Sequence, residues 1–153
     1  MHRILVGVDG SAESLQAVAW VAALAKQVDG LEVIAAAAYG LEPSAAAYGG
    51  MGLSGDFWQQ WRDEIQRGLD GDWTKPLREA DVQVTTDVEE GQPEEVLSRM
   101  ATEREADLIV VGSRGRGHLR GMFLGSVSHA LALHAPCPVV IIPHQHGHDK
   151  EAE

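Results

Sequence analysis

One stretch of this sequence decides the fold. It reads Leu108-Ile109-Val110-Val111-Gly112-Ser113-Arg114-Gly115-Arg116-Gly117-His118-Leu119-Arg120-Gly121-Met122-Phe123-Leu124-Gly125-Ser126-Val127-Ser128. The four apolar residues at its start are typical of a strand buried on both faces. Its five glycines allow positive φ and bring backbone N–H groups close to an anion, while a helix N-terminus at Ser126 adds unpaired donors. The stretch therefore predicts a strand, a phosphate-binding loop and a helix in succession.

Short apolar or β-branched runs on either side predict further strands at residues 4–8, 31–38, 82–88 and 139–142. Helical patterns lie between the strands. Ser11 is a suitable N-cap for a first helix that extends to Val28, Pro93 opens another, and the last covers residues 126–134 and stops before Pro136. Strands that alternate with helices are typical of an α/β domain with a parallel sheet.

A longer helix is predicted between the second and third strands, because an apolar residue recurs there at every fourth position. The recurring residues are Phe57, Trp61, Ile65, Leu69, Trp73 and Leu77. This stripe favours packing against the sheet over stacking on a cofactor. The preceding residues 39–55 contain five glycines and predict an irregular loop on the ligand-binding side of the sheet, where both a lid and a merely variable loop remain open.

Length and composition indicate one compact domain. The chain has 153 residues, of which 44% are hydrophobic, and we expect a domain over residues 1–143 and a polar, disordered tail over 144–153. No apolar run reaches the roughly 20 residues that span a bilayer, and no secretory signal is apparent. The single cysteine, Cys137, cannot form an internal disulfide, so we expect a cytoplasmic protein without membrane partners.

The distribution of charge is more informative than its sum. The net charge of −11 argues against nucleic-acid binding. No Asp or Glu occurs over the 41 residues between Asp107 and Asp149, although an even distribution would place about six there, and the same segment holds Arg114, Arg116 and Arg120. Burial of strands and helices explains the missing acids about as well as anion binding does, but it does not explain three arginines in one loop.

Common phosphate motifs fail when the spacing is counted. A Walker A loop requires Lys after its second glycine, whereas Gly112 and Gly117 are followed by His118. A dinucleotide fingerprint that starts at Gly115 requires glycine where Arg120 stands. The pattern that remains is Gly-x2-Gly-x9-Gly-Ser, formed by Gly112, Gly115, Gly125 and Ser126.

With this pattern the sequence resembles the universal stress protein family, specifically its UspA-like, ATP-binding branch. Four blocks carry the resemblance in order: Ile-Leu-Val-Gly-Val-Asp-Gly-Ser from residue 4, Ala-Asp-Leu-Ile-Val-Val-Gly-Ser-Arg-Gly from 106, Leu-Gly-Ser-Val-Ser from 124, and His-Ala-Pro-Cys-Pro-Val-Val-Ile-Ile from 134. The resemblance implies an adenine-nucleotide alpha-hydrolase-like fold, which is a doubly wound five-stranded parallel sheet of order 3-2-1-4-5 with helices on both faces.

The resemblance also implies a site where strands one and four end. Asp9 and Gly10 would meet the adenosine, with Ala38 near the base. The ribose and phosphates would lie among Val111, Gly112, Arg114, Gly115, Gly125, Ser126 and Val127. Structural roles stay open for three of these residues, because Asp9 and Ser126 are also suitable helix caps and Arg114 is also suited to a solvated loop.

The function implied by the resemblance is a nucleotide-dependent regulatory or signalling module of the stress response that binds ATP. A slow ATPase or phosphotransferase using the same pocket, and a scaffold without nucleotide, are the alternatives. Since neither a P-loop lysine nor a carboxylate of the acid-free segment is available, we expect slow turnover at most, with Mg²⁺ carried on the phosphates. The family's strand order places residues Val139–Ile142 at a sheet edge, which predicts a homodimer through this strand; an unidentified protein partner is also possible.

Overall fold

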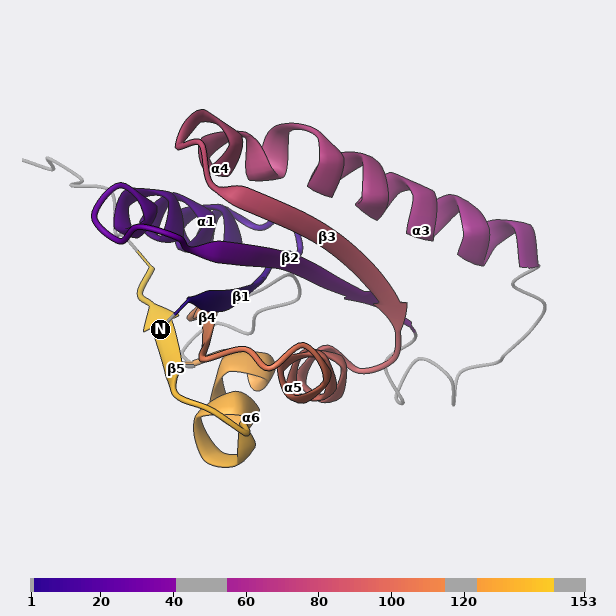
Figure 1. Cartoon of the computed structure of the whole chain (residues 1–153). Helices are drawn as coiled ribbons and strands as arrows, with labels where there is room; N and C mark the ends of the chain where they lie inside the picture. The colour runs from indigo at the N-terminus through magenta and orange to yellow at the C-terminus, as the bar shows by residue number, and fades with distance from the viewer. Residues whose placement is uncertain (1, 41–54, 115–123, 145–153) are drawn as a thin grey trace, which may run out of the picture.

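The computed structural model describes residues 2–40, 55–114 and 124–144. They form one five-stranded parallel sheet in the order β3-β2-β1-β4-β5 (Figure 1). The strands are β1 (Arg3–Gly7), β2 (Glu32–Tyr39), β3 (Gln83–Glu90), β4 (Leu108–Gly112) and β5 (Val139–Ile142). The helices are α1 (Ala12–Ala25), α3 (Gly55–Asp70), η1 (Asp72–Thr74), α4 (Lys75–Glu79), α5 (Pro93–Glu103) and α6 (Ser126–His134). The strand order is the one that the resemblance implies.

Helices cover both faces of the sheet, as Figure 1 shows. Alternation along β1 explains the two layers: Ile4 and Val6 point to the face covered by α1, α3 and α4, whereas Leu5 points to the face covered by α5 and α6. All three of these side chains are completely buried. The chain reverses its winding direction between β1 and β4, so the carboxyl ends of these two strands mark the topological switch point of the sheet.

The predicted elements agree with the structure to within one or two residues at most ends. The strand at 139–142 and the helix at 126–134 have the predicted bounds. The first helix is shorter than predicted, because it ends at Ala25 and Lys26 is its C-cap. The irregular loop predicted over residues 39–55 is shorter at both ends, because Tyr39 belongs to β2 and Gly55 to α3. Residues 41–54, on which a lid would depend, lie outside the described residues.

The single long helix predicted from Phe57 to Leu77 is wrong. The chain breaks after Asp70, passes through η1 and resumes as α4. The backbone of Gly71 leaves the helical conformation, with φ of −108° and ψ of −123°, and a Cβ on Gly68 would come within 2.6 Å of the Trp73 ring. Trp73 therefore folds back onto α3, and Leu69 and Leu77 still reach the core from two separate helices. Packing of this stripe against the sheet is confirmed for its second half, whereas Phe57 remains 41% exposed.

The edge strand β5 is less buried than its apolar sequence predicts. Ile142 is buried, but the other three residues of the strand are only partly so. Within the described residues, β5 pairs on one side only, with β4. A four-residue apolar edge is therefore left along this side of the sheet.

Candidate functional site

The candidate site lies at the carboxyl edge of the sheet, where β1 and β4 end side by side. Val6 pairs with Val110, and a Cβ on Gly7 would lie 3.1 Å from Val111 Cγ1. Beyond this point the chain leaves β1 for α1, and it leaves β4 toward the start of α6. Open α/β sheets bind ligands at such an edge.

Asp9 and Gly10 stabilise the turn from β1 to α1 through a side-chain hydrogen bond and a positive φ, respectively. Asp9 Oδ1 accepts a hydrogen bond from the Ser11 N–H at 2.9 Å, and Ser11 Oγ accepts from the Ser14 N–H at 3.3 Å. Gly10 has φ of +80°, a conformation that glycine adopts without strain. Ser11 is the N-cap, as predicted. Asp9 therefore supports the N-cap of α1 by accepting from the Ser11 N–H, which is the structural role left open for it. Its side chain is exposed at the carboxyl edge of the sheet.

Gly112 is a glycine because α1 lies directly against the end of β4. A Cβ added there would come within 2.7 Å of the backbone carbon and of the Cβ of Glu13. The same glutamate reaches the far edge of the sheet, since its Oε1 lies 2.6 Å from His144 Nδ1. Gly112 does not have positive φ, so close helix packing is the reason for this glycine.

The start of α6 differs from the prediction in one respect. Gly125 is the N-cap, with φ of −67°, and Ser126 is the first helical residue. The interpretation of Ser126 as an N-cap is therefore wrong, and positive φ does not explain Gly125. Since Ser126 is exposed and its N–H is one of the first-turn donors without an intrahelical acceptor, it remains suited to an anion.

Two buried serines connect β4 to α6, and the sequence prediction missed both. The Gly125 N–H donates to the Ser113 carbonyl at 2.6 Å. Ser128 Oγ donates to the same carbonyl at 2.8 Å. The start of α6 is thereby held at the end of β4. Their positions in Gly-Ser-Arg and Ser-Val-Ser were visible in the sequence, but nothing there indicated that they meet.

Arg114 follows Ser113 just beyond the end of β4. Its Nε is buried and has no hydrogen-bond partner within the part of the chain that the structure describes. A buried guanidinium nitrogen is costly without an acceptor. An anionic oxygen would supply one.

The other predicted site residues are distributed over the same edge. Ala38 lies near the end of β2, two residues beyond Ala36, whose carbonyl accepts from the Val8 N–H at 2.8 Å. Val111 is buried in the core layer beneath α5 and α6, and Val127 packs against that layer. Gly115 lies outside the described residues. The predicted tail lies outside them too, except for His144.

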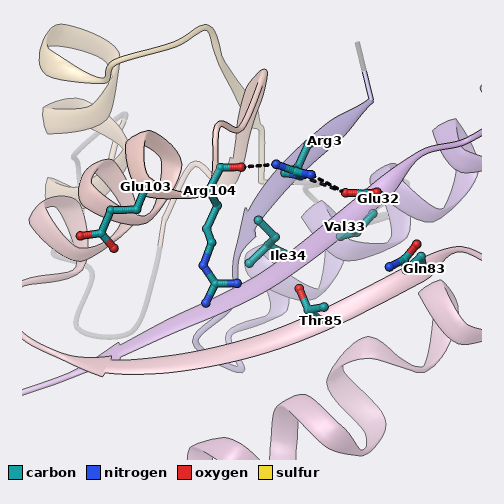
Figure 2. Close-up of a pocket in the computed structure, with 8 residues that line it drawn as sticks. All are labelled: Arg3, Glu32, Val33, Ile34, Gln83, Thr85, Glu103 and Arg104. Atoms are coloured by element: carbon teal, nitrogen blue, oxygen red, sulfur yellow. Dashed lines mark hydrogen bonds and ion pairs between the residues drawn. The ribbon is translucent and has the colours of Figure 1, made fainter.

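A separate hollow of about 270 Å³ lies at the opposite edge of the sheet (Figure 2). It is lined by Arg3, Glu32, Val33, Ile34, Gln83, Thr85, Glu103 and Arg104. Its charges neutralise one another: Arg3 Nε bonds Glu32 Oε2 at 2.9 Å, Arg104 Nη2 bonds Asp87 Oδ2 at 2.8 Å, and Glu103 pairs with Arg99. This hollow is therefore a poor site for phosphate.

Residues 2–40, 55–114 and 124–144 form neither a metal centre nor a membrane-spanning helix. Within these ranges no group of three or more His, Cys, Asp and Glu is placed to hold a metal ion. None of the helices there has the length and hydrophobicity needed to cross a membrane.

Residues 1–143 match the sequence model of the universal stress protein family. The chain belongs to this family. Among universal stress proteins of known name, YxiE of Bacillus subtilis is 31% identical over 145 residues, an alignment that covers 92% of this chain and 98% of YxiE.

Solved structures of universal stress proteins and related chains have the same fold. The structure of protein MJ0577 covers 95% of this chain and 97% of its own, with a TM-score of 0.81 and 21% identity. A universal stress protein in complex with cAMP covers 93% and 96%, with a TM-score of 0.62 and 26% identity. A family member from Arabidopsis thaliana with AMP bound covers 95% and 94%, with a TM-score of 0.66 and 19% identity.

Proposed function

We propose that this universal stress protein binds ATP between the carboxyl ends of β1 and β4 and acts as a nucleotide-dependent regulatory module of the stress response. The observation that carries the proposal is the buried Arg114 Nε, just beyond the end of β4, which has no hydrogen-bond partner among the described residues. Two chains of the same fold have adenine nucleotides, cAMP and AMP. This supports the adenine class of ligand.

The adenosine half of ATP fits the β1 side of the site. Asp9 and Gly10 follow β1 at the switch point, and Ala38, the last residue but one of the neighbouring strand β2, carries only a methyl group. A small side chain leaves room for a planar base, and the exposed carboxylate of Asp9 would accept a hydrogen bond from a ribose hydroxyl. These residues would bind the nucleoside whatever the number of phosphates.

The phosphates fit the β4 side. The N–H groups of Ser126 and Val127 stand in the first turn of α6, where the helix dipole favours negative charge. Arg114 would add a charge-assisted hydrogen bond through the guanidinium. Gly112, Gly125 and, outside the described residues, Gly115 would bring the backbone close to the phosphate oxygens.

Mg²⁺ would enter with the nucleotide and be held mainly by phosphate oxygens and water. The segment between Asp107 and Asp149 contains no carboxylate, and the nearby Glu13 carboxylate is paired with His144. A bound Mg²⁺ would neutralise part of the phosphate charge. Chelation of the metal should therefore weaken ATP binding without affecting binding of adenosine.

The test is calorimetric titration of ATP into the wild-type protein and into Gly125→Val. Valine tolerates φ of −67°, so the variant should fold while its branched Cβ occupies space beside the first turn of α6. We expect ATP binding to be lost in this variant and kept in the control Gly55→Val, at the first residue of α3, where an added Cβ would meet no described atom within 4 Å. Wild-type affinity in a folded Gly125→Val would show that the site is misassigned.

A homodimer through β5 is part of the proposal. The free edge of β5 is apolar, and Leu133 on the neighbouring helix α6 is 64% exposed. Two copies of this strand can pair antiparallel about a two-fold axis. Light scattering at micromolar concentration should give twice the mass of the chain; a monomer whose mass does not change with ATP would refute the dimer.

A further inference from the structure

The two ends of the segment from Arg114 to Leu124 are tied together by hydrogen bonds at one carbonyl. The Ser113 carbonyl accepts from the Gly125 N–H at 2.6 Å and from Ser128 Oγ at 2.8 Å. The Gly125 carbonyl lies 3.2 Å from the same hydroxyl. On its other side, the Ser113 N–H donates to the Ile142 carbonyl at 2.8 Å. Three elements, β4, α6 and β5, therefore meet at Ser113.

Ser128 stands out within this network because it is a polar side chain in the core. It is 2% exposed, and Ser113 is 5% exposed. On the same face of α6, one turn later, Leu131 is buried with apolar neighbours. A buried hydroxyl at such a position needs a hydrogen-bond partner. Ser128 has one in the carbonyl of Ser113, the residue that follows β4 at the edge of the candidate site.

We propose that Ser128 is a positioning residue for phosphate, and this inference rests on the proposed function. Its hydroxyl holds the first turn of α6 at a set distance from the end of β4. The N–H groups of Ser126 and Val127 and the side chain of Arg114 then face the same phosphate oxygens. Hydrogen bonds to those oxygens weaken steeply outside a narrow range of distance and angle, so a small displacement of α6 costs phosphate affinity.

The effect is confined to one half of the ligand. Ser128 contacts the β4 side of the site, whereas Asp9 and Gly10 lie in the turn after β1 and Ala38 lies on β2. Loss of the hydroxyl leaves the Gly125 N–H bonded to Ser113, so α6 stays attached but less well oriented. ATP should therefore lose affinity, and adenosine should not.

The experiment compares Ser128→Ala with Thr74→Val. Thr74 is completely buried, and its hydroxyl donates to the Leu69 carbonyl near the break after α3, on the other face of the sheet. Both variants remove one buried hydroxyl, and Thr74→Val also removes the acceptor of a hydrogen bond from Arg78, so Thr74→Val should lose at least as much stability in urea unfolding. Affinities for ATP and adenosine are measured by NMR titration, which detects binding up to millimolar dissociation constants.

We expect Ser128→Ala to bind ATP at least tenfold more weakly than Thr74→Val does, with adenosine affinity within twofold of wild type. Ser128→Cys keeps the volume but weakens the donor; it should show an intermediate loss and replaces alanine if that variant does not fold. Equal ATP affinity in the position 128 and position 74 variants overturns the positioning role while leaving the proposed function intact. A wild-type protein that binds no ATP overturns both.

Discussion

The substitution Gly112→Ala tests whether α1 really rests on the end of β4. The added Cβ would lie 2.7 Å from Glu13 C, 2.7 Å from Glu13 Cβ and 2.8 Å from Glu13 O. Carbon atoms in ordinary contact are about 3.5–4.0 Å apart. None of the three atoms is the end of a flexible side chain, so the strand and the helix must separate by about 1 Å.

The cost follows from the atoms that have to move. Overpacking by one methyl group in a well-packed site costs about 1–3 kcal/mol. The upper part of this range is expected, because Glu13 belongs to the first turn of α1 and is also held by His144. Urea unfolding of the nucleotide-free protein measures the loss.

Gly55→Ala is the matched control. A Cβ on Gly55 would meet no described atom within 4 Å, and alanine is favoured over glycine in a helix by about 0.5–1 kcal/mol. This variant should be as stable as wild type or slightly more stable. A Gly112→Ala protein whose free energy of unfolding lies within about 0.5 kcal/mol of wild type would refute the close packing of α1 on β4.

Three further predictions concern pH, reactivity and turnover. The N–H groups of His2 and Arg3 lower the pKa of Asp107. Asp107 therefore stabilises the fold above its unfolded pKa of about 3.9, and this contribution is lost as the pH falls below that value. The difference in urea midpoint between wild type and Asp107→Asn should be present at pH 7 and shrink at pH 3; a difference that does not change with pH would contradict the prediction. Burial, with a smaller effect of the Asp107 charge, raises the pKa of the Cys137 thiol, so the folded protein should react with a thiol reagent at pH 8 more slowly than the urea-unfolded protein; equal rates would rule this out. ATP with magnesium should stay largely intact over minutes in which an ordinary kinase or ATPase, at roughly 1–100 turnovers per second, would consume it; chromatography that finds ADP in excess of protein, and not in Ser126→Ala, would favour the slow-enzyme alternative.

The sequence predicts the elements of this fold well where the local signal is strong. Apolar runs mark β4 and β5, and Pro93 marks the first residue of α5. The break between α3 and α4 is missed because the spacing of apolar residues continues through it. Periodicity reveals neither the non-helical backbone of Gly71 nor the contact between Gly68 and the Trp73 ring.

The candidate site is predicted less completely. The motif residues lie at the expected edge, but the structural reason for each differs: Gly112 accommodates Glu13, and Gly125 rather than Ser126 is the N-cap of α6. Ser113 and Ser128 were missed because their hydrogen bond joins residues that lie 15 positions apart, and only the fold brings them together.

The most direct measurement is the set of backbone amide shift changes when ATP and magnesium are added to isotope-labelled protein. The account predicts that the largest changes cluster at the ends of β1 and β4 and in the first turn of α6, at Gly10, Gly112, Gly125, Ser126 and Val127, with saturation as ATP approaches stoichiometric excess. Shift changes centred on the opposite edge, at Arg3 and Arg104, or no changes at millimolar ATP, would contradict it.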